Sequence, residues 1–121
     1  INTPGAPAPI GPYSQAVKAG SMLFISGQIA IDPATGTIRN DHIKAETQQV
    51  MNNLKAILDQ AGATFGHVVK TTIFLSDMAL FSEVNEVYGS YFKEDFPARE
   101  TVAVKGLPRN VNVEISMIAS L

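Results

Sequence analysis

The segment 111-VNVEISMIA-119 alternates apolar residues with mostly polar ones over its whole length. Strict alternation predicts a β-strand, because successive side chains of a strand point to opposite faces of a sheet. One predicted face is entirely apolar and carries Val111, Val113, Ile115, Met117 and Ala119. The other face carries Asn112, Glu114, Ser116 and Ile118. This strand therefore defines an apolar face and a mixed face of the sheet, and the side chains of the other predicted strands can be compared with these two faces.

Patterns elsewhere in the chain predict two helices and four further strands. Apolar residues recur every three or four positions over 42–61 and 79–93, which is typical of amphipathic helices. Alternating or β-branched segments predict strands at 14–17, 22–31, 68–76 and 100–105. We expect Asp41 to cap the first helix and Gly62 to end it. The result is one α+β domain, residues 1–121, with the order β-β-α-β-α-β-β.

Both faces of this predicted sheet are partly apolar. Over 22–31, one face carries Leu23, Ile25, Ile29 and Ile31, and the other carries Met22, Phe24, Ser26 and Gln28. Over 68–76, Val69, Ile73 and Leu75 are predicted opposite Val68 and Phe74. Two helices cover only one face of such a sheet. The second face, with Met22, Phe24, Phe74 and either Val102 or Ala103, predicts an oligomer whose sheets meet.

Composition excludes several classes of protein. The net charge of -2 and the absence of a basic stripe argue against a nucleic-acid binder. Cysteine is absent, so disulfides and thiolate sites are excluded. His42 and His67 have no further ligands at metal-binding spacing, so no metal site is expected. No apolar run is long enough to span a membrane, and the Pro-rich N-terminal arm, residues 1–12, does not resemble a secretion signal. A cytoplasmic location is expected.

Three side chains are candidates for chemistry. Arg99, in 96-FPARETVAV-104, is either a surface ion-pair partner or a bidentate clamp for a carboxylate. Glu114, in the middle of a strand, is either a solvent-exposed residue or a functional acid. Tyr13, at the end of the arm, is either a core anchor or a hydrogen-bonding group.

Six segments together resemble one known family. They are IGPYSQAV, SGQIAIDPATG, VVKTTIFLSDM, FSEVNEVYGSYF, FPARETVAV and VNVEISMIA, and they cover nearly the whole chain in order. On these motifs the chain resembles the Rid family, also called the YjgF family, and within it the RidA type.

This resemblance implies a fold and a reaction. The fold is a chorismate-mutase-like mixed sheet with two helices on one face and the other face buried in a homotrimer, with active sites between subunits. The reaction is hydrolysis of 2-enamine or 2-imine acids, such as 2-aminoacrylate/2-iminopropanoate and 2-iminobutanoate, to 2-keto acids and ammonium. The resemblance implies no cofactor.

The resemblance also implies roles for individual residues. Arg99 corresponds to the arginine that holds the substrate carboxylate, and Glu114 to the acid that orients or activates water. The other positions that match the family's pocket are Tyr13, Ser26, Gly27, Asn85 and Thr101. Many relatives carry cysteine where Thr101 stands, and 100-ETVAVKGLP-108 departs from the commoner SCVEVARLP.

Other functions remain open from the sequence. A non-catalytic trimer that binds or senses small carboxylates would need Arg99 but not Glu114. A chorismate-mutase-type enzyme is suggested by fold analogy alone. Ribonuclease and chaperone roles have been attributed within the family, and the acidic net charge argues against the first.

Overall fold

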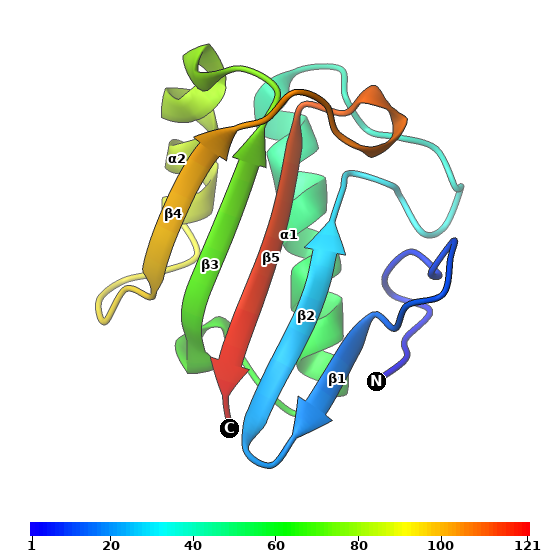
Figure 1. Ribbon diagram of the computed structural model, residues 1–121, viewed down its shortest axis with the longest axis vertical. Helices are drawn as coiled ribbons and strands as arrows, with labels where there is room; N and C mark the ends of the chain where they lie inside the picture. Colours follow the sequence, from blue (N-terminus) through cyan, green and yellow to red (C-terminus); the bar gives the residue numbers. More distant parts are fainter.

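Five strands form one mixed sheet in the order β1-β2-β5-β3-β4 (Figure 1). The computed structural model describes residues 1–121. The strands are β1 (Ala16–Ala19), β2 (Met22–Gln28), β3 (Val68–Leu75), β4 (Ala98–Ala103) and β5 (Val113–Ser120). All neighbours are antiparallel except β3 and β4, which run parallel. The predicted order β-β-α-β-α-β-β is confirmed.

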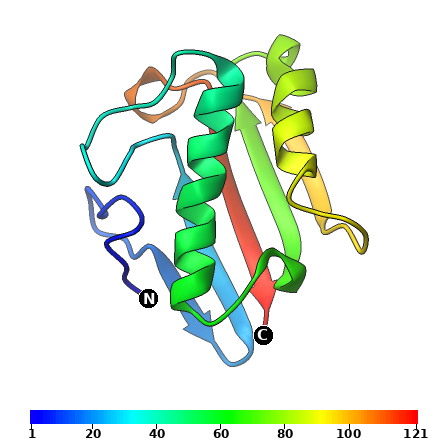
Figure 2. The ribbon, with the colours of Figure 1, turned by 180° about the vertical axis from the view of Figure 1, so that it is seen from behind.

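Two helices, α1 (Ile43–Gln60) and α2 (Phe81–Gly89), lie on the same face of the sheet (Figure 2). The N-cap of α1 is His42, whose Nδ1 accepts the N–H of Ala45 at 3.2 Å, so the prediction of Asp41 was wrong. Gly62 follows the end of α1 with a φ of +74°, a conformation that glycine adopts without a steric penalty.

The second helix is shorter than the predicted span 79–93. Its first turn is a separate 3₁₀-helix, η2 (Met78–Leu80), in which the carboxylate of Asp77 accepts the N–H of Ala79 at 2.8 Å. The other 3₁₀-helices are η1 (Phe65–His67) and η3 (Pro108–Asn110). None of the helices is long and apolar enough to cross a membrane.

The hydrophobic core fills the space between the helices and the sheet. The apolar side chains predicted on one face of the last strand are all buried, which confirms the alternation: Val111, Val113, Ile115, Met117 and Ala119. All of them except Val111 belong to one continuous cluster with four residues of α1, namely Val50, Leu54, Ile57 and Leu58. Val111 belongs to a smaller cluster with Ile29 and Ile31.

Two β-bulges change the faces predicted for β2 and β3. Between Ile25 and Gln28, β2 advances three residues while β5 advances two, so Gln28 pairs with Ile115 and is buried. A second irregularity, between Val68 and Lys70, turns Val68 into the core and leaves Val69 45% exposed. The faces predicted for Gln28, Val68 and Val69 were therefore wrong.

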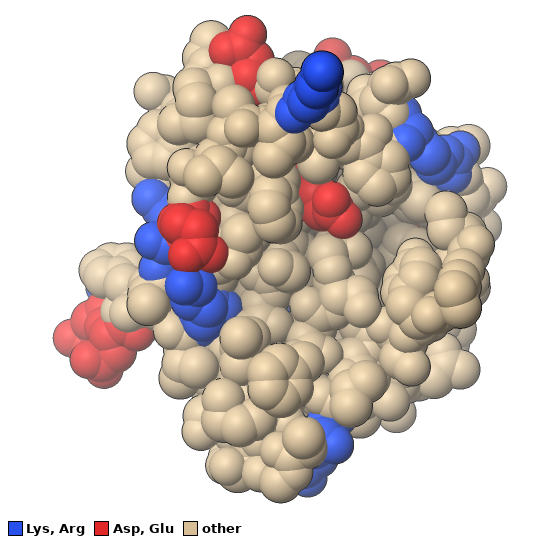
Figure 3. Space-filling view, viewed as in Figure 1, with Lys and Arg blue, Asp and Glu red and all other residues tan.

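The face of the sheet away from the helices is uncovered in the single chain. Phe24 and Val102 are 45% and 43% exposed on it, and Phe74 lies beside Val102 as its register partner. Val102, and not Ala103, thus belongs to this open face. One patch of charge on it lies over β3 and β4, at one edge, where Lys70 pairs with Glu100 at 2.7 Å (Figure 3).

A buried carboxylate ties α1 to the start of β5. Glu46 is fully buried, and its two oxygens accept the backbone N–H of Asn112 at 2.7 Å, the side-chain amide of Asn112 at 2.9 Å and the N–H of Val113 at 3.2 Å. These charge-assisted bonds fix where β5 begins, and therefore the face on which the next residue, Glu114, emerges.

Replacement of Glu46 by alanine should destabilise the fold, because three donors lose their acceptor and two of them belong to the backbone. We expect Glu46→Ala to lower the free energy of unfolding by about 3 kcal/mol. The exposed residue Glu94 offers a control, and Glu94→Ala should change it by less than about 0.5 kcal/mol. Urea denaturation at one fixed protein concentration measures both, and equal stabilities of the two variants would contradict the assignment.

Candidate active site

The N-terminal arm is held against the sheet by one side chain. Gln15 is 2% exposed, and its amide nitrogen donates to the carbonyls of Thr3 at 3.0 Å, Ala6 at 3.3 Å and Pro7 at 3.0 Å. Its amide oxygen accepts the N–H of Thr3 at 2.7 Å. Prolines cannot donate to a strand ladder, so these four bonds replace the backbone bonds that the arm lacks.

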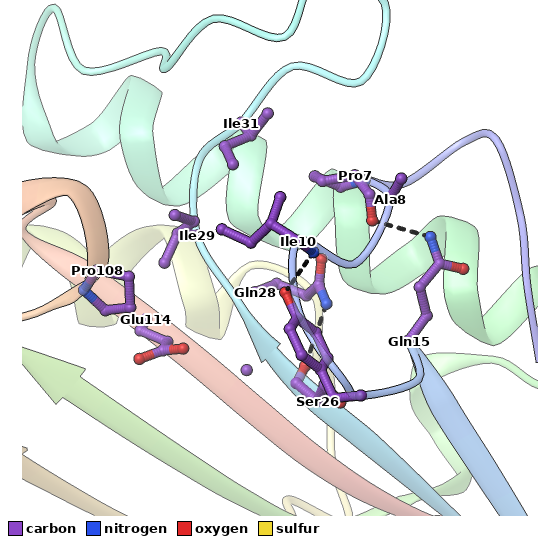
Figure 4. Close-up of a pocket in the computed structure, with 12 residues that line it drawn as sticks. Pro7, Ala8, Ile10, Gln15, Ser26, Gln28, Ile29, Ile31, Pro108 and Glu114 are labelled. Atoms are coloured by element: carbon purple, nitrogen blue, oxygen red, sulfur yellow. Dashed lines mark hydrogen bonds between the residues drawn. The ribbon is translucent and has the colours of Figure 1, made fainter.

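A cavity of about 400 Å³, here called the arm pocket, lies between this arm, the end of β2 and the start of β5 (Figure 4). It is lined by Pro7, Ala8, Ile10, Tyr13, Gln15, Ser26, Gly27, Gln28, Ile29, Ile31, Pro108 and Glu114. Four of the residues singled out by sequence are thus brought together: Tyr13, Ser26, Gly27 and Glu114. Of the lining side chains, only those of Glu114 and Tyr13 are titratable.

The bulge in β2 brings the backbone of Gly27 against the Glu114 carboxylate. A Cβ at position 27 would clash with Oε2 of Glu114, so the carboxylate keeps this position only while residue 27 is glycine. Ser26 is fixed beside it, because its hydroxyl donates to the carbonyl of Ser14 at 2.6 Å. Glu114 has no salt-bridge partner, and burial raises the pKa of its carboxyl above the ordinary value. Such a group is suited to accept and return a proton.

A second cavity, here called the arginine pocket, lies beside α2 and β4. It has a volume of about 430 Å³ and is lined by Asn85, Tyr88, Gly89, Phe96, Pro97 and Arg99. Nη1 of Arg99 donates to the side-chain oxygen of Asn85 at 2.7 Å. The guanidinium carbon lies 5.2 Å from the ring centre of Tyr88 and 5.5 Å from that of Phe81, which are cation–π distances.

Arg99 is held in place without a carboxylate partner. The four salt bridges of the protein involve other cations, which removes the surface ion-pair interpretation. Tyr88, one of the rings beside the guanidinium, is itself fixed by donating its hydroxyl to Thr71 at 3.0 Å. One guanidinium N–H is used by Asn85, so the rest of the planar fork remains available to an anion.

Arg99 and Glu114 emerge on opposite faces of the sheet. In the β3–β4 register Arg99 is the partner of Thr71, which is buried under the helices. In the β3–β5 register Glu114 is the partner of Phe74, which lies on the open face. A single chain therefore does not bring the two predicted catalytic residues into one cavity.

Thr101 lines neither pocket. It is the partner of Ile73 and faces the helices, and its hydroxyl is buried without a hydrogen-bond partner. Sequence reasoning missed several lining residues of the arm pocket, namely Ile10, Gln15, Gln28, Ile29, Ile31 and Pro108. The glycine inside the β2 pattern was the signal available for the bulge that forms this pocket.

Known proteins resemble this chain along its entire length. The family model described as "Endoribonuclease L-PSP" matches residues 3–121. A RutC family protein of Pyrococcus horikoshii is 55% identical over 98% of this chain and 94% of its own length. The chloroplastic Reactive Intermediate Deaminase A of Arabidopsis thaliana is 46% identical over 100% of this chain and 65% of its own length.

Solved structures share the same fold. RidA from an Antarctic Psychrobacter has a TM-score of 0.96 at 43% identity, covering 100% of this chain and 98% of that one. Escherichia coli TdcF, solved with bound serine, has a TM-score of 0.95 at 40% identity, covering 100% and 97%. These matches agree with the motifs and with the strand order. The chain belongs to the family described as endoribonuclease L-PSP, which is the Rid, or YjgF, family.

Proposed function

We propose that this protein hydrolyses reactive 2-imino acids and their 2-enamine tautomers to 2-keto acids and ammonium. Family membership and 46% identity to a Reactive Intermediate Deaminase A support a general role in deaminating reactive intermediates. The observation that carries the finer proposal is the preorganised guanidinium of Arg99, held by Asn85 and two aromatic rings with no carboxylate of its own. A small carboxylate is the natural ligand for such a fork.

The complete site is proposed to form between two copies of the chain. Each copy has an arginine pocket on one side of its sheet and an arm pocket on the other. A contact that joins the arginine pocket of one copy to the arm pocket of the next therefore pairs two different surfaces. A head-to-tail contact of this kind forms a ring when its rotation closes, and three copies make the smallest such ring. The apolar open face, with Phe24, Phe74 and Val102, supplies area for that contact. A homotrimer, the assembly that the family resemblance implies, satisfies this requirement.

Arg99 is proposed to bind the substrate carboxylate bidentately. Because the guanidinium is already fixed, little rotamer entropy is lost on binding, and the imine carbon next to the carboxylate is oriented at the same time. TdcF was solved with serine, an amino acid that presents a carboxylate beside a substituted carbon much as an imino acid does.

Glu114 is proposed to move the proton during hydrolysis. The protonated imine, R–C(=NH₂⁺)–COO⁻, is attacked at its carbon by water while Glu114 accepts a proton from that water. The same proton returns to the nitrogen, and Glu114 then takes the proton of the new hydroxyl group as the C–N bond breaks. Glu114 passes this second proton to the departing ammonia, so R–CO–COO⁻ and NH₄⁺ leave. Ser26, Gly27, Tyr13 and Asn85 would shape the site, and the backbone beside Thr101 would contact the substrate. No group outside the chain is needed for these proton transfers.

An RNA substrate is less consistent with the charges of this chain. Lys44, Lys55, Lys70 and Arg39 are each paired with a carboxylate, and the net charge is -2. Binding of a phosphate backbone requires a set of unpaired cations on one surface. We propose that the ligand is one small acid, not a nucleic acid.

The second candidate function is a non-catalytic trimer that binds small carboxylates. Arg99 favours it as strongly as it favours catalysis, whereas the unpaired Glu114 in a cavity favours catalysis. Tight binding of a keto acid with no acceleration of imine hydrolysis would select this alternative.

Loss of either charged group should reduce deamination. We expect Arg99→Ala to lower kcat/KM about 10–100-fold, mainly through KM, because a charge-assisted contact to the carboxylate is lost. We expect Glu114→Gln to lower kcat about 100-fold or more with little change in KM. Lys18→Ala, at an exposed residue of β1, is the control. Rates are measured by competition with semicarbazide for an imino acid generated in the assay, and wild-type rates in both folded variants would contradict the roles.

The rate should also depend on the ionisation of Glu114. Since burial raises the pKa of this carboxyl, activity should fall with decreasing pH through a pKa above the usual value of about 4.3 for glutamate. The residual activity of Glu114→Gln should lack this acid limb. The same raised pKa means that folding is penalised once the carboxyl ionises, so Glu114→Gln should be more stable than wild type at neutral pH and lose that advantage at acid pH. Identical acid limbs in the two proteins would exclude Glu114 as the titrating base.

A further inference from the structure

Three side chains of α2 surround the guanidinium of Arg99. They are Phe81, Asn85 and Tyr88, which follow one another at spacings of four and three residues and therefore share one face of the helix. Asn85 binds one nitrogen of the guanidinium, and the two rings lie 5.5 Å and 5.2 Å from its central carbon. A hydrogen bond to one nitrogen does not fix the plane of the guanidinium, so the orientation of the fork depends on the two rings.

The cation–π contact does not require the hydroxyl of Tyr88. Phe81 makes the second such contact without a hydroxyl. The hydroxyl supplies no counter-ion either, because burial raises the pKa of the Tyr88 phenol and keeps the ring uncharged beside Arg99. Removing this hydroxyl from water is nevertheless costly. The hydroxyl therefore has a function other than cation–π attraction or charge.

The hydroxyl of Tyr88 closes a circuit of contacts around Arg99. It donates to the hydroxyl of Thr71 at 3.0 Å, and Tyr88 is the one hydrogen-bond partner of that hydroxyl. Thr71 is also the register partner of Arg99 in the parallel β3–β4 pair, where neighbouring strands lie about 4.8 Å apart. Arg99 is thus tied to Thr71 through the sheet, Thr71 to Tyr88 through the two hydroxyls, and the Tyr88 ring to the guanidinium.

This circuit lies inside the single chain. Thr71 and Tyr88 are 0% and 4% exposed, so a second copy that covers the arginine pocket leaves their contact unchanged. Phe92 packs against the ring of Tyr88 at a centroid distance of 4.9 Å and further limits its movement. The ring beside the guanidinium is therefore held at its hydroxyl and along its side.

We propose that Tyr88 and Thr71 are positioning residues for the carboxylate clamp, and that their hydrogen bond sets the plane in which the Arg99 guanidinium meets a carboxylate. The inference rests on the proposed role of Arg99 in binding the substrate. The two hydroxyls are buried against each other and act on the substrate only through Arg99. A fork that is oriented before binding loses less entropy in a bidentate contact, so loss of the anchor weakens binding and leaves the chemical step nearly unchanged.

The test measures binding and catalysis in variants that each remove one hydroxyl. Tyr88→Phe and Thr71→Val both abolish the hydrogen bond and keep the rest of the side chain. Calorimetry gives the Kd of pyruvate, a 2-keto acid. Competition with semicarbazide gives kcat and KM for 2-iminopropanoate, which an L-amino acid oxidase with catalase generates from alanine. We expect each variant to raise Kd and KM about three- to tenfold and to change kcat less than about twofold.

The double variant Tyr88→Phe/Thr71→Val separates positioning from folding. Either single variant leaves one buried hydroxyl without a partner and should unfold at a lower urea concentration. The double variant removes both hydroxyls and should regain most of the lost stability. Its Kd for pyruvate should stay raised by the same factor as in each single variant, because the two hydroxyls act as one unit.

Tyr91→Phe is the matched control. It also removes one tyrosine hydroxyl, which accepts a hydrogen bond from Gln48. The ring of Tyr91 packs against Phe65 at 5.0 Å and makes no cation–π contact with Arg99. Kd, KM and kcat of this variant should therefore equal those of the wild type.

The remaining outcomes contradict one part of the proposal each. Wild-type affinity for pyruvate in the double variant, or in both folded single variants, would show that the hydrogen bond serves stability alone and would overturn the positioning role. A double variant whose Kd rises by the product of the two single effects would overturn the coupling of the two hydroxyls. Absence of imine hydrolysis by the wild type, with pyruvate binding still weakened in Tyr88→Phe, would overturn the deaminase function and leave the positioning role intact. Failure of the wild type both to bind pyruvate and to hydrolyse the imine would overturn the two together.

Discussion

Strand β3 lies between β4 and β5, and its registers with both determine where the two candidate catalytic charges, Arg99 and Glu114, emerge. Pairing of Thr71 with Arg99 directs the guanidinium towards α2, whereas pairing of Phe74 with Glu114 directs the carboxylate to the open face. Because side chains of a strand alternate, a shift of one residue in either register would move that charge to the other face. The separation of the two groups within one chain follows from these two registers, and it is the reason why we propose that a second copy completes the site.

The two charges are kept available by different physical means. The guanidinium of Arg99 is accommodated by one amide oxygen and two aromatic rings, which hold a cation without neutralising it. The carboxylate of Glu114 lies against a glycine at a bulge, and burial raises the pKa of its carboxyl. Both arrangements depend on buried polar anchors elsewhere, with Glu46 fixing the start of β5 and Gln15 fixing the arm. The candidate site is thus supported by buried polar groups other than Arg99 and Glu114 themselves.

Sequence patterns predicted the order of elements and the buried face of β5, because alternation over 111–119 is set by neighbours along the chain. They failed at Gln28, Val68 and Val69, since a bulge inserts a residue relative to a partner strand that local sequence does not identify. Asp41 and His42 are both plausible caps, and only the entry direction of α1 decides between them. Arg99 and Glu114 were recognised as candidates, but the aliphatic lining of the arm pocket was not. Ile10, Ile29 and Ile31 meet there only through the bonds of Gln15 and the bulge in β2.

The most direct test of a site shared between copies is subunit mixing. Differently tagged Arg99→Ala and Glu114→Gln chains are co-expressed, and rings that contain both are purified through the two tags. In a mixed ring of three, one contact pairs an intact Arg99 with an intact Glu114, so such rings should show about one third of the wild-type rate per ring. Mixed rings no more active than either variant alone would contradict the account.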